Sequence, residues 1–594
     1  MSHLLAEIKI ENYKSILSEV FELSAYTPLI GYNNAGKSNI LSAIKWLLRR
    51  TSLQVNDFNN LDLPVVVEGR IDGITDELLN SILPSHKVSI SKFIVDGSLQ
   101  IRRTQLVPGD SVARIKLQVF SSEATAGSEW VSNPTGIDNA LNALFPEPIQ
   151  IGAMENAEED VSKSKTTTTI GKLLGEIIGP LETQYGAQVR NVLDELKGIM
   201  DADGHSRAAE LRQFDTAVNQ KIDSFFPDIN IKLHVPTPEL KEVFNKGTIK
   251  IYEHQDSEGR DISSLGHGAQ RSIQMALIRH LAELKREEEN HNTTTLLLID
   301  EPELYLHPQA IEIVRDSLKA LSTEGYQVVF STHSAIMVTS DDIADAVLIR
   351  KTRARGTYKR STLKSAVPHI EADSASQIGL LFSLSNSSKI LFSEKIILAE
   401  GRTEQKLLPR LFEAIAGKSM GLHKYALISM GGVASTKKSM QVLEVMDLPT
   451  RSIVDLDFGF INAIKDGFLD EEDTDVVACH MIFDEIASSN GITLAQNGWP
   501  AKSSSMTAAE AFVVLANQIK AQPHIEAIHQ KLLLHGIWLW RMGSIETHLG
   551  IVGKNEMVWA SFANLMKSSY LPDLIRDYNG VADCINWLIG NEAI

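Results

Sequence analysis

Residues Gly31 to Ser38 have the Gly-x-x-x-x-Gly-Lys-Ser spacing of a phosphate-binding loop, between a short apolar strand and an amphipathic helix. Such a loop surrounds phosphates with backbone N–H groups, while its lysine reaches the terminal phosphates and its last hydroxyl binds Mg²⁺. The expected chemistry is the binding of ATP with one Mg²⁺ ion. The residues predicted to contact the nucleotide or its ion are Asn33, Asn34, Gly36, Lys37, Ser38 and Asn39.

Two later apolar strands end in polar residues suited to phosphoryl transfer. The first, Leu296 to Ile299, is followed by Asp300 and Glu301. We expect Asp300 to complete the Mg²⁺ shell and Glu301 to orient or activate the attacking water, because phosphoryl transfer needs positioning and charge neutralisation more than covalent help. The second strand, Val328 to Phe330, precedes His333, which is placed to sense the γ-phosphate.

A Ser/Gly-rich turn precedes a predicted helix from Ser272 to Leu284. Backbone N–H groups at a helix N-terminus attract anions, so Ser264, Gly266 and Gly268 are candidate phosphate contacts. Taken alone, the turn is only a helix cap. Gln150, near a predicted strand, is a candidate Mg²⁺-sensing residue, although a lone glutamine is more often an ordinary strand residue.

The C-terminal third contains a second group of acidic residues next to apolar strands. Glu400 follows the strand Lys395 to Ala399, and Glu404 comes shortly after it. Asp455 and Asp457 are predicted to lie on a strand and to point to one face, because alternate residues of a strand share a face. Carboxylates at neighbouring strand ends repel unless cations lie between them, and oxygen ligands suit Mg²⁺ or Mn²⁺. The pattern therefore predicts a divalent-metal site.

The ordered motifs of the N-terminal half resemble the ABC-type ATPase heads of the SMC and RecF groups. The resemblance implies that two heads sandwich ATP and that the turn with Ser264, Gly266 and Gly268 completes the site of the opposite subunit. The strand with Glu-Gly-x-x-Glu and the later Asp-x-Asp resemble a Toprim domain. An ABC head followed by Toprim in one chain resembles the OLD (overcoming lysogenization defect) family of ATP-dependent nucleases.

This resemblance implies a DNA endonuclease that hydrolyses phosphodiester bonds with two metal ions and also hydrolyses ATP. Gly543 to Glu546 looks like the family's late Gly-x-x-Glu element, with Ser544 where many members carry Asp. A basic residue usually joins the site, and the candidates are Lys567 and Lys554. The implied catalytic residues are Glu400, Glu404, Asp455, Asp457, Glu546, Lys567, Glu301 and His333; the carboxylates of the Toprim region bind its metal ions, and Ser38 and Asp300 bind the ion of ATP.

The resemblance also implies partners and a biological setting. Family members form homodimers or tetramers through the heads and a helical insertion, and they act in bacterial antiphage defence. Some act beside a helicase, as in Gabija systems, or with a reverse transcriptase and its DNA product, as in retrons. The rival interpretation is a RecF-like ATPase that binds DNA without cutting it; an intact carboxylate set after residue 390 argues against it. A primase or topoisomerase is disfavoured because neither uses an ABC head in the same chain.

These residues must be positioned by an α/β chain of more than one domain, because 594 residues exceed a single core. We expect an ATPase head over residues 1–385, with an inserted helical region at 155–240, and a Toprim domain with a parallel sheet and C-terminal helical elements over 386–594. Short β-rich segments between Pro64 and Phe120 predict an antiparallel arm beside the head. In the insertion, apolar residues recur at helical spacing, which predicts core packing or, alternatively, a self-association surface.

Composition indicates a soluble, cytoplasmic protein without a membrane span or secretory leader, with 43% hydrophobic and 22% charged residues. The net charge of −18 excludes a surface that is basic all over, so contact with nucleic acid must be local. A basic run from Arg350 to Lys364 is either a solvated hairpin or a strip that contacts phosphates. Cys479 and Cys584 are predicted to be buried thiols.

Overall fold

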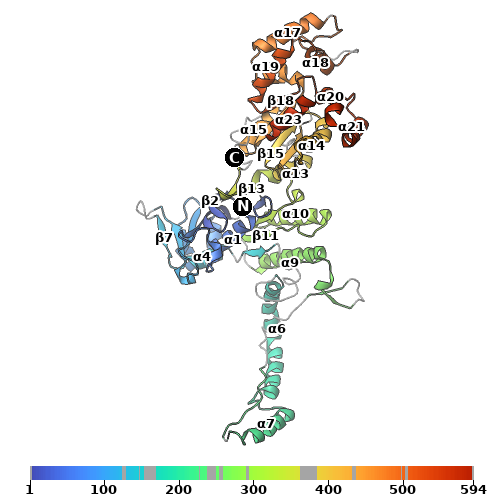
Figure 1. The fold of residues 1–594 in the computed structure, drawn as a ribbon. Helices are drawn as coiled ribbons and strands as arrows, with labels where there is room; N and C mark the ends of the chain where they lie inside the picture. Colours follow the sequence, from blue (N-terminus) through green and yellow to red (C-terminus); the bar gives the residue numbers. More distant parts are fainter. Residues whose placement is uncertain are drawn as a thin grey trace. The chain divides into compact units, whose positions relative to one another are not determined.

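The computed structural model describes residues 3–122, 129–145, 148–152, 169–226, 228–236, 249–252, 258–288, 293–361, 384–430, 436–487, 489–496, 498–501 and 506–590 (Figure 1). The chain forms two compact units. The first comprises residues 1–8, 23–26 and 40–331, and the second comprises residues 9–22, 27–39 and 332–594. Strand β1 (Leu4–Tyr13) and helix α1 (Lys37–Leu48) each begin in one unit and end in the other. The domain boundary predicted near residue 385 lies inside the second unit and stays a prediction.

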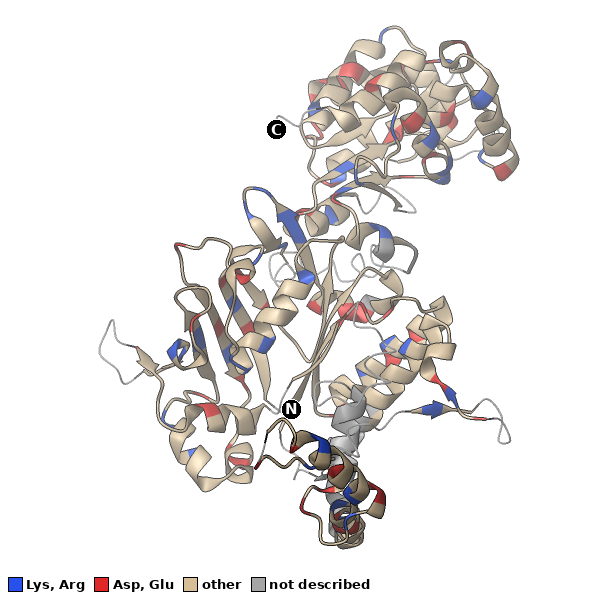
Figure 2. Ribbon diagram, turned by 60° about the horizontal axis from the view of Figure 1, so that its bottom comes forward, with Lys and Arg blue, Asp and Glu red and all other residues tan. Residues whose placement is uncertain are grey.

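The first unit contains the predicted antiparallel arm. Its strands follow the order β7-β6-β5-β4, with every neighbouring pair antiparallel. The bounds are β4 (Val65–Asp72), β5 (Leu99–Gln105), β6 (Lys116–Phe120) and β7 (Trp130–Ser132), with helices α2 (Asp76–Ser81), α3 (Pro84–Ser91) and α4 (Ile137–Leu144). Acidic and basic residues are interspersed along these strands (Figure 2), and Arg102 on β5 pairs with Glu68 on β4 at 2.6 Å.

The same unit holds the parallel strands β8 (Ile149–Ile151), β11 (Thr295–Asp300) and β12 (Tyr326–Thr332). The apolar run of β11 is buried on both faces, as expected for a central strand of a covered parallel sheet. Helix α10 (Pro308–Thr323) follows β11, and helix α9 spans His267–Glu288. The predicted start of α9 at Ser272 is therefore wrong. The glycine-rich turn is itself helical, because the N–H groups of Ala269 and Gln270 donate to the carbonyl oxygen of Gly266.

Helices α6 (Thr169–Met200) and α7 (Ala209–Ile222) form the predicted helical insertion of the first unit. Within this unit, α6 projects away from the sheet and α7 lies at its far end (Figure 1). The polar stretch predicted at 158–168 lies outside the described residues. Val192 is 63% exposed and Phe225, just after α7, is 77% exposed. The prediction that these apolar stripes form a core is wrong for the described side chains, which leaves the self-association surface as the alternative.

In the second unit, four strands follow the order β2-β14-β13-β3, with bounds β2 (Ile16–Glu22), β14 (Gly356–Lys359), β13 (Val347–Thr352) and β3 (Tyr26–Ile30). β13 and β14 form an antiparallel hairpin, whereas β13 and β3 are parallel. The basic run of the sequence therefore begins in a hairpin, as one interpretation expected.

A separate four-stranded parallel sheet of the second unit has the order β16-β15-β17-β18, with bounds β16 (Tyr425–Ser429), β15 (Lys395–Ala399), β17 (Thr450–Val454) and β18 (Ile537–Leu539). Around it lie α13 (Leu384–Leu391), α14 (Arg402–Ala416), α15 (Thr436–Val445), α20 (Ile545–Leu549), α21 (Glu556–Ser568), α22 (Leu571–Leu574) and α23 (Tyr578–Ile589). α14 buries its apolar face, which includes Leu407 and Leu411, against a core shared with Trp538 and Ile585. This is the parallel α/β arrangement predicted for the C-terminal domain.

Beyond β17, the chain adds a helical part made of α16 (Asn462–Lys465), α17 (Thr474–Ala487), α18 (Ala508–Ala516) and α19 (Gln522–Leu533). The last three of these helices lie together in Figure 1. Cys479 and Cys584 are buried free thiols, which confirms that prediction. None of the helices that the structure describes combines the length and apolarity needed to cross a bilayer.

Candidate active site

The phosphate-binding loop connects β3 to α1 and has a backbone that few residue types adopt. Asn34 and Gly36 have φ angles of 65° and 103°. Lys37 is only 5% exposed; its Nζ donates to the carbonyl oxygen of Gly31 at 2.9 Å and lies 2.7 Å from Nε2 of His333. Because an ammonium group only donates, Nε2 of His333 accepts. The structure thus brings together two residues that the sequence placed in the ATP site.

A network of side-chain hydrogen bonds that no sequence motif predicts supports this loop. Oγ1 of Thr357, on β14, donates to the carbonyl oxygen of Ala35 at 2.8 Å and lies 2.7 Å from Oγ of Ser15. Nδ2 of Asn39 donates to the same Ser15 oxygen at 2.7 Å. A Cβ atom at Gly36 would come within 2.1 Å of Oγ1 of Thr357, so the close approach requires glycine. No local sequence pattern marks Thr357 as a neighbour of the loop.

The basic hairpin is not a strip of free cations. Arg350 is 2% exposed, and its guanidinium donates to the carbonyl oxygen of Ser393 at 3.0 Å. Arg360 is also buried and donates to the carbonyl oxygen of Glu394. For these two arginines the phosphate-contact interpretation is wrong, because both guanidinium groups bind the backbone just before β15. Residues 362–364 of the run lie outside the described residues.

The acidic end of β11 is held by its neighbours within the first unit. Oγ of Ser331 donates a hydrogen bond to the carboxylate of Asp300. The same Ser331 oxygen accepts a hydrogen bond from the N–H of Glu301 at 3.0 Å. Glu301 has a φ of 48°. Arg271, from the glycine-rich turn, donates to the carbonyl oxygens of Asp300 and Glu301 at 3.2 and 3.3 Å. The turn and the acidic strand end are therefore joined, although Asp300 and Glu301 belong to a different unit from the phosphate-binding loop.

The predicted contacts of the glycine-rich turn, and Gln150, also lie in the first unit. Ser264 ends a short 3-10 helix and its hydroxyl donates to the carbonyl oxygen of Asp261. A Cβ at Gly268 would meet the carbonyl oxygen of Tyr305 at 2.7 Å, whereas a Cβ at Gly266 would meet nothing within 4 Å. Packing therefore explains the glycine at 268 but not the one at 266. Gln150 lies on β8, opposite a residue of the acidic strand β11.

The acidic residues of the C-terminal part follow the carboxyl ends of neighbouring parallel strands. The register pairs Ala399 of β15 with Ile453 of β17, so Glu400 lies beside the end of β17. The N–H of Asp455 donates to Oε2 of Glu400 at 3.1 Å. Ligand sites of open α/β sheets form at this edge.

Asp455 and Asp457 are not on the strand itself, contrary to the prediction. β17 ends at Val454, and Asp455 is the N-cap of a 3-10 helix, Leu456–Gly459, that contains Asp457. The two aspartates still lie near Glu400. The charge of Asp457 raises the pKa of Glu400, and the charge of Glu400 raises the pKa of Asp455.

Burial and like charge shift the protonation of this group. Glu404 is only 3% exposed. Burial, followed by the charge of Asp457, raises the pKa of Glu400 to about 7. Burial and the charge of Glu400 raise the pKa of Asp455 well above its ordinary value. Burial also raises the pKa of Glu404 to about 7. These shifts are the expected result of several carboxylates sharing one poorly solvated place.

The cation at this edge is Lys554, one of the two basic candidates. Its Nζ lies 3.6 Å from Oδ2 of Asp455 and 3.5 Å from Oε2 of Glu546. Although burial works against it, the charges of these acids raise the pKa of Lys554. Lys567, the preferred candidate, is exposed in the last turn of α21. The ion pairs with Asp455 and Glu546 are made by Lys554 instead.

Several residues that sequence reasoning missed hold the acidic residues in place. Oγ1 of Thr403 donates to Oε1 of Glu546 at 2.5 Å and accepts from Nε1 of Trp559 at 3.1 Å. The N–H of Leu456 donates to the carbonyl oxygen of Gly543 at 2.7 Å, which ties the Asp-x-Asp turn to the Gly-x-x-Glu turn. Thr403 lies within the Glu-Gly-x-x-Glu motif, so its position next to the acids could have been predicted from the sequence. Trp559 lies far along the chain, and no local pattern connects it to the motif.

A buried histidine fixes the turn that precedes Glu546. Nδ1 of His548 lies 2.6 Å from Oδ2 of Asp577, and its Nε2 accepts from the N–H of Met542 at 3.1 Å. Since Nε2 accepts, the imidazole is neutral and its proton is on Nδ1. Burial lowers the pKa of His548, in agreement with the neutral form.

Comparison with known proteins places the chain in a family. A family profile described as "AAA ATPase domain" matches residues 4–107 and 153–338, and one described as "Overcoming lysogenization defect protein-like, TOPRIM domain" matches residues 391–457. "Old nuclease" of Escherichia phage P2 is 39% identical over 594 residues, covering 99% of this chain and 100% of that protein. The chain belongs to the OLD family. The predicted α/β fold class with an ATPase and a Toprim domain, and the nuclease class of enzyme, are thereby confirmed, whereas the bounds of the two domains stay predictions.

A more distant relative and two solved structures also match parts of the chain. "OLD nuclease" of Thermus scotoductus is 21% identical over 470 residues, covering 75% of this chain and 80% of that protein. An SMC head domain from Pyrococcus furiosus with an extended coiled coil, bound to the C-terminal domain of ScpA, is 14% identical; the match covers 62% of this chain and 98% of that one, with a TM-score of 0.36. The SMC head from Thermotoga maritima gives 15% identity, coverages of 60% and 97%, and a TM-score of 0.27.

The Toprim acids of this OLD-family chain have the donor chemistry of a divalent-metal site. Oε2 of Glu546 is buried and makes no hydrogen bond within the described part of the chain, and the ammonium group of Lys554 lies 3.5 Å from it, so this oxygen already has a cation as its neighbour. Across the described residues, however, no three acidic, histidine or cysteine side chains converge closely enough to hold one ion as they stand. The residue types and their burial fit a metal, and ligation requires local adjustment of the side chains.

Proposed function

We propose that the chain is a divalent-metal-dependent DNA endonuclease whose cutting is controlled by ATP. The observation that carries this proposal is the group of buried carboxylates at one edge of the parallel sheet, with pKa values raised by burial and by one another. Such a group is unfavourable in its ionised form unless cations accompany it. A non-cutting ATPase has no use for it.

The residues of this edge divide into two sets of oxygen donors. Glu400, Asp455 and Asp457 would hold one Mg²⁺ or Mn²⁺ ion, and Glu404 and Glu546 would help hold a second. Two such ions, when bound, supply activation of a water molecule and stabilise the departing 3′ oxygen of a phosphodiester. The chain itself supplies donor oxygens in a fixed order along the sheet edge.

Lys554 completes the electrostatics of the site. It is 60% exposed in its side chain and lies within 3.6 Å of two acids. We assign it a contact with the scissile phosphate, because a long, half-solvated lysine beside carboxylates can move toward an incoming anion. This role replaces the one expected of Lys567.

The hairpin β13–β14 gives ATP a physical route to the nuclease region. Thr357 binds the phosphate loop, while Arg350 binds the backbone next to β15. Tyr32, within the loop, donates through its hydroxyl to the carbonyl oxygen of Lys351, and Nζ of Lys424 lies 5.2 Å from the centre of its ring. A change in the loop on nucleotide binding would thus act on residues that pack against β15 and β16. We therefore propose that the protein has two conformations and that ATP changes their populations.

Self-association through the helical insertion is supported by its exposed apolar side chains. Val192, Phe214, Phe225 and Phe226 are between 47% and 77% exposed, an arrangement that a second copy would cover. We propose a homodimer or tetramer that also involves the ATPase regions. The resemblance to the OLD family further supports a cytoplasmic role in antiphage defence, alone or with a helicase or a reverse transcriptase partner.

Incubation of supercoiled plasmid with Mg²⁺ or Mn²⁺, with and without ATP, tests the nuclease proposal. We expect the wild type to nick or linearise the plasmid and Glu400→Ala to leave it supercoiled. Glu413→Ala, an exposed glutamate on α14, is the matched control and should cut as the wild type does. If the wild type breaks no DNA under any metal and nucleotide condition, the RecF-like alternative stands in its place; equal cutting by Glu400→Ala would refute the site assignment.

A further inference from the structure

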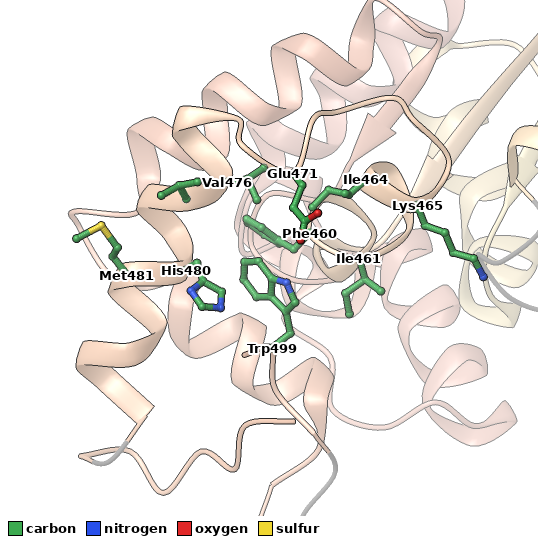
Figure 3. Close-up of a pocket in the computed structure, with 10 residues that line it drawn as sticks. Phe460, Ile461, Ile464, Lys465, Glu471, Val476, His480, Met481 and Trp499 are labelled. Atoms are coloured by element: carbon green, nitrogen blue, oxygen red, sulfur yellow. The ribbon is translucent and has the colours of Figure 1, made fainter. Parts of the chain in front are cut away.

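A cavity of about 520 Å³ lies in the helical part that follows the Asp-x-Asp turn (Figure 3). Phe460, Ile461 and Lys465 line it immediately after Asp457 in the chain. The N–H groups of Phe460 and Ile461 both donate to the carbonyl oxygen of Asp457, at 3.2 and 3.1 Å. The cavity wall is therefore attached by main-chain hydrogen bonds to one of the proposed metal-binding residues.

Rigid aromatic rings form the inner wall of this cavity. The ring centres of Phe460 and Trp499 are 5.0 Å apart, and His480 meets Trp499 edge-on at 4.8 Å. Phe512 stacks behind Phe460 at 5.5 Å. A wall of packed rings offers a preformed surface for a planar aromatic guest, and a volume of several hundred Å³ accommodates a nucleoside.

The mouth of the cavity is apolar and open. Met481 is 62% exposed and Val477 is 43% exposed, and both line the cavity. Figure 3 shows His480 and Trp499 close together on one side of the space and Glu471 and Ile464 on another. The side chains that line the cavity and carry polar groups include Glu471, His480, Trp499 and Lys465.

Three lysines gather around Asp466, which follows the cavity residue Lys465 in the chain. Burial raises the pKa of Asp466, and Lys437, Lys465 and Lys438 work against that rise, so all three ammonium groups lie near this carboxyl. Nζ of Lys437 would be 4.0 Å from a Cβ at Gly467. This local cluster meets the requirement, set by a net charge of −18, that contact with nucleic acid be confined to one place.

We propose that the cavity receives one unpaired nucleobase of the DNA strand at the metal site, with its ring against Trp499, while Lys465, Lys437 and Lys438 bind the adjoining phosphates. A nucleobase matches the cavity because it is planar and stacks on aromatic rings, and the exocyclic amino group of adenine, cytosine or guanine can donate a hydrogen bond to the Glu471 carboxylate. An unpaired base satisfies the geometry, since a base inside a duplex is not free to enter a pocket. This inference rests on the proposed nuclease function and specifies how the same site holds its substrate.

The test is an abasic scan with the full-length protein. End-labelled oligonucleotides of one sequence, each with a single abasic residue at a different position, are cut with Mn²⁺ or Mg²⁺. We expect one position beside the cut at which loss of the base slows cutting by about 10-fold, since stacking of one base contributes about 1–3 kcal/mol. Met481→Glu and Val477→Glu, which place a charge at the exposed mouth, should slow the intact substrate and abolish this position dependence.

Ile519→Glu is the matched control, because Ile519 is 83% exposed in the same helical part and does not line the cavity. It should keep both the wild-type rate and the sensitive position. A wild-type enzyme that cuts the intact oligonucleotide equally well at every abasic position would overturn the base-binding inference and leave the nuclease proposal standing. Retention of the sensitive position by both mouth variants would also overturn it. Failure to cut the intact oligonucleotide with any metal would instead count against the proposed function.

Discussion

The phosphate-binding loop buries a positive charge, whereas the acidic sheet edge buries several acidic groups. In the loop, the single buried charge of Lys37 has partners from the chain: the carbonyl oxygen of Gly31 and the imidazole of His333. At the sheet edge, carboxylates face one another, and burial raises the pKa of Glu400 and Asp455. The charge in the loop is thus met by polar groups of the chain, whereas at the edge Lys554 faces several acids, and the proposal is that metal ions balance their remaining charge.

This difference teaches which parts of each site are fixed in advance. A loop whose donors and acceptors are paired within the chain depends on the residues that support it, such as Thr357. A group of like charges has no single preferred arrangement until ions arrive, so its sensitivity lies in the charges themselves. The following predictions test that contrast.

The largest effect is expected from Glu400→Gln, which keeps the shape of the side chain but removes its charge. DNA cutting should fall by more than about 100-fold, because loss of groups that only support metal ligands already costs 10- to 100-fold. ATP hydrolysis should stay near the wild-type rate, whereas Lys37→Ala should lose it. Parallel assays of plasmid cutting and phosphate release decide the matter, and loss of ATP hydrolysis in Glu400→Gln would show that the two regions are not separable.

Thr403→Val tests whether the acidic edge needs support from the chain as well as from ions. The variant removes the hydroxyl that donates to Glu546, so we expect cutting to weaken by about 10-fold and to need more metal for half-maximal rate. A titration of Mn²⁺ in the cutting assay measures this shift. Thr403→Ser keeps the hydroxyl and should behave as the wild type; equal defects in both variants would mean that the methyl group matters and the hydrogen bond does not.

Thr357→Val tests the support of the loop. Removing the hydrogen bond to Ala35 should weaken ATP binding by about 5-fold, the value of one ordinary hydrogen bond of roughly 1 kcal/mol. Isothermal titration with a non-hydrolysable ATP analogue measures the change, with Thr357→Ser as the control. If cutting without ATP is unchanged while its response to ATP is altered, the hairpin route between the two regions gains support; an unaltered response would exclude Thr357 from it.

The smallest effect concerns pH and thermal stability. The folded pKa of Glu400, about 7, exceeds its ordinary value of 4.5, so its contribution to stability is present below pH 4.5 and is lost as the pH rises to about 7. Divalent ions should relieve the repulsion of the ionised form, and they compete with protons below pH 7. We expect Mg²⁺ or Mn²⁺ to raise the melting temperature more at pH 8 than at pH 6, by about 2 °C. Glu400→Gln should shrink that difference, and an equal or opposite difference in the wild type would contradict the proposed metal site.

Motifs with fixed local spacing were predictable, and supports from elsewhere in the chain were not. Lys37, Glu400 and Glu404 stand out because their spacing follows one loop or one strand–helix unit. Thr357 and Trp559 lie more than 150 residues along the chain from the residues that they bind. Oγ1 of Thr357 is 2.8 Å from the carbonyl oxygen of Ala35, and Nε1 of Trp559 is 3.1 Å from Oγ1 of Thr403. The residues next to them in sequence do not indicate these contacts. The choice between Lys567 and Lys554 was open for the same reason.

Charge patterns were harder to interpret than motifs. A run of basic residues from Arg350 onward suggested contact with phosphates, but Arg350 and Arg360 are buried and bind carbonyl oxygens. Sequence shows charge without showing whether a side chain ends in solvent. The apolar stripe with Val192 posed the inverse problem, since helical spacing predicts an apolar face but not what covers it.

The sequence by itself determined the order of the chemistry in this chain: a phosphate loop, an acidic strand end and three separate Toprim motifs, each motif encoded by residues close together in the chain. Tertiary structure alone decided which distant side chains complete each site, because strand register brings Glu400 beside Asp455 and loop packing brings Lys554 to both Asp455 and Glu546. The physical reason is that backbone shape depends on neighbours in sequence, whereas burial and charge pairing depend on neighbours in space.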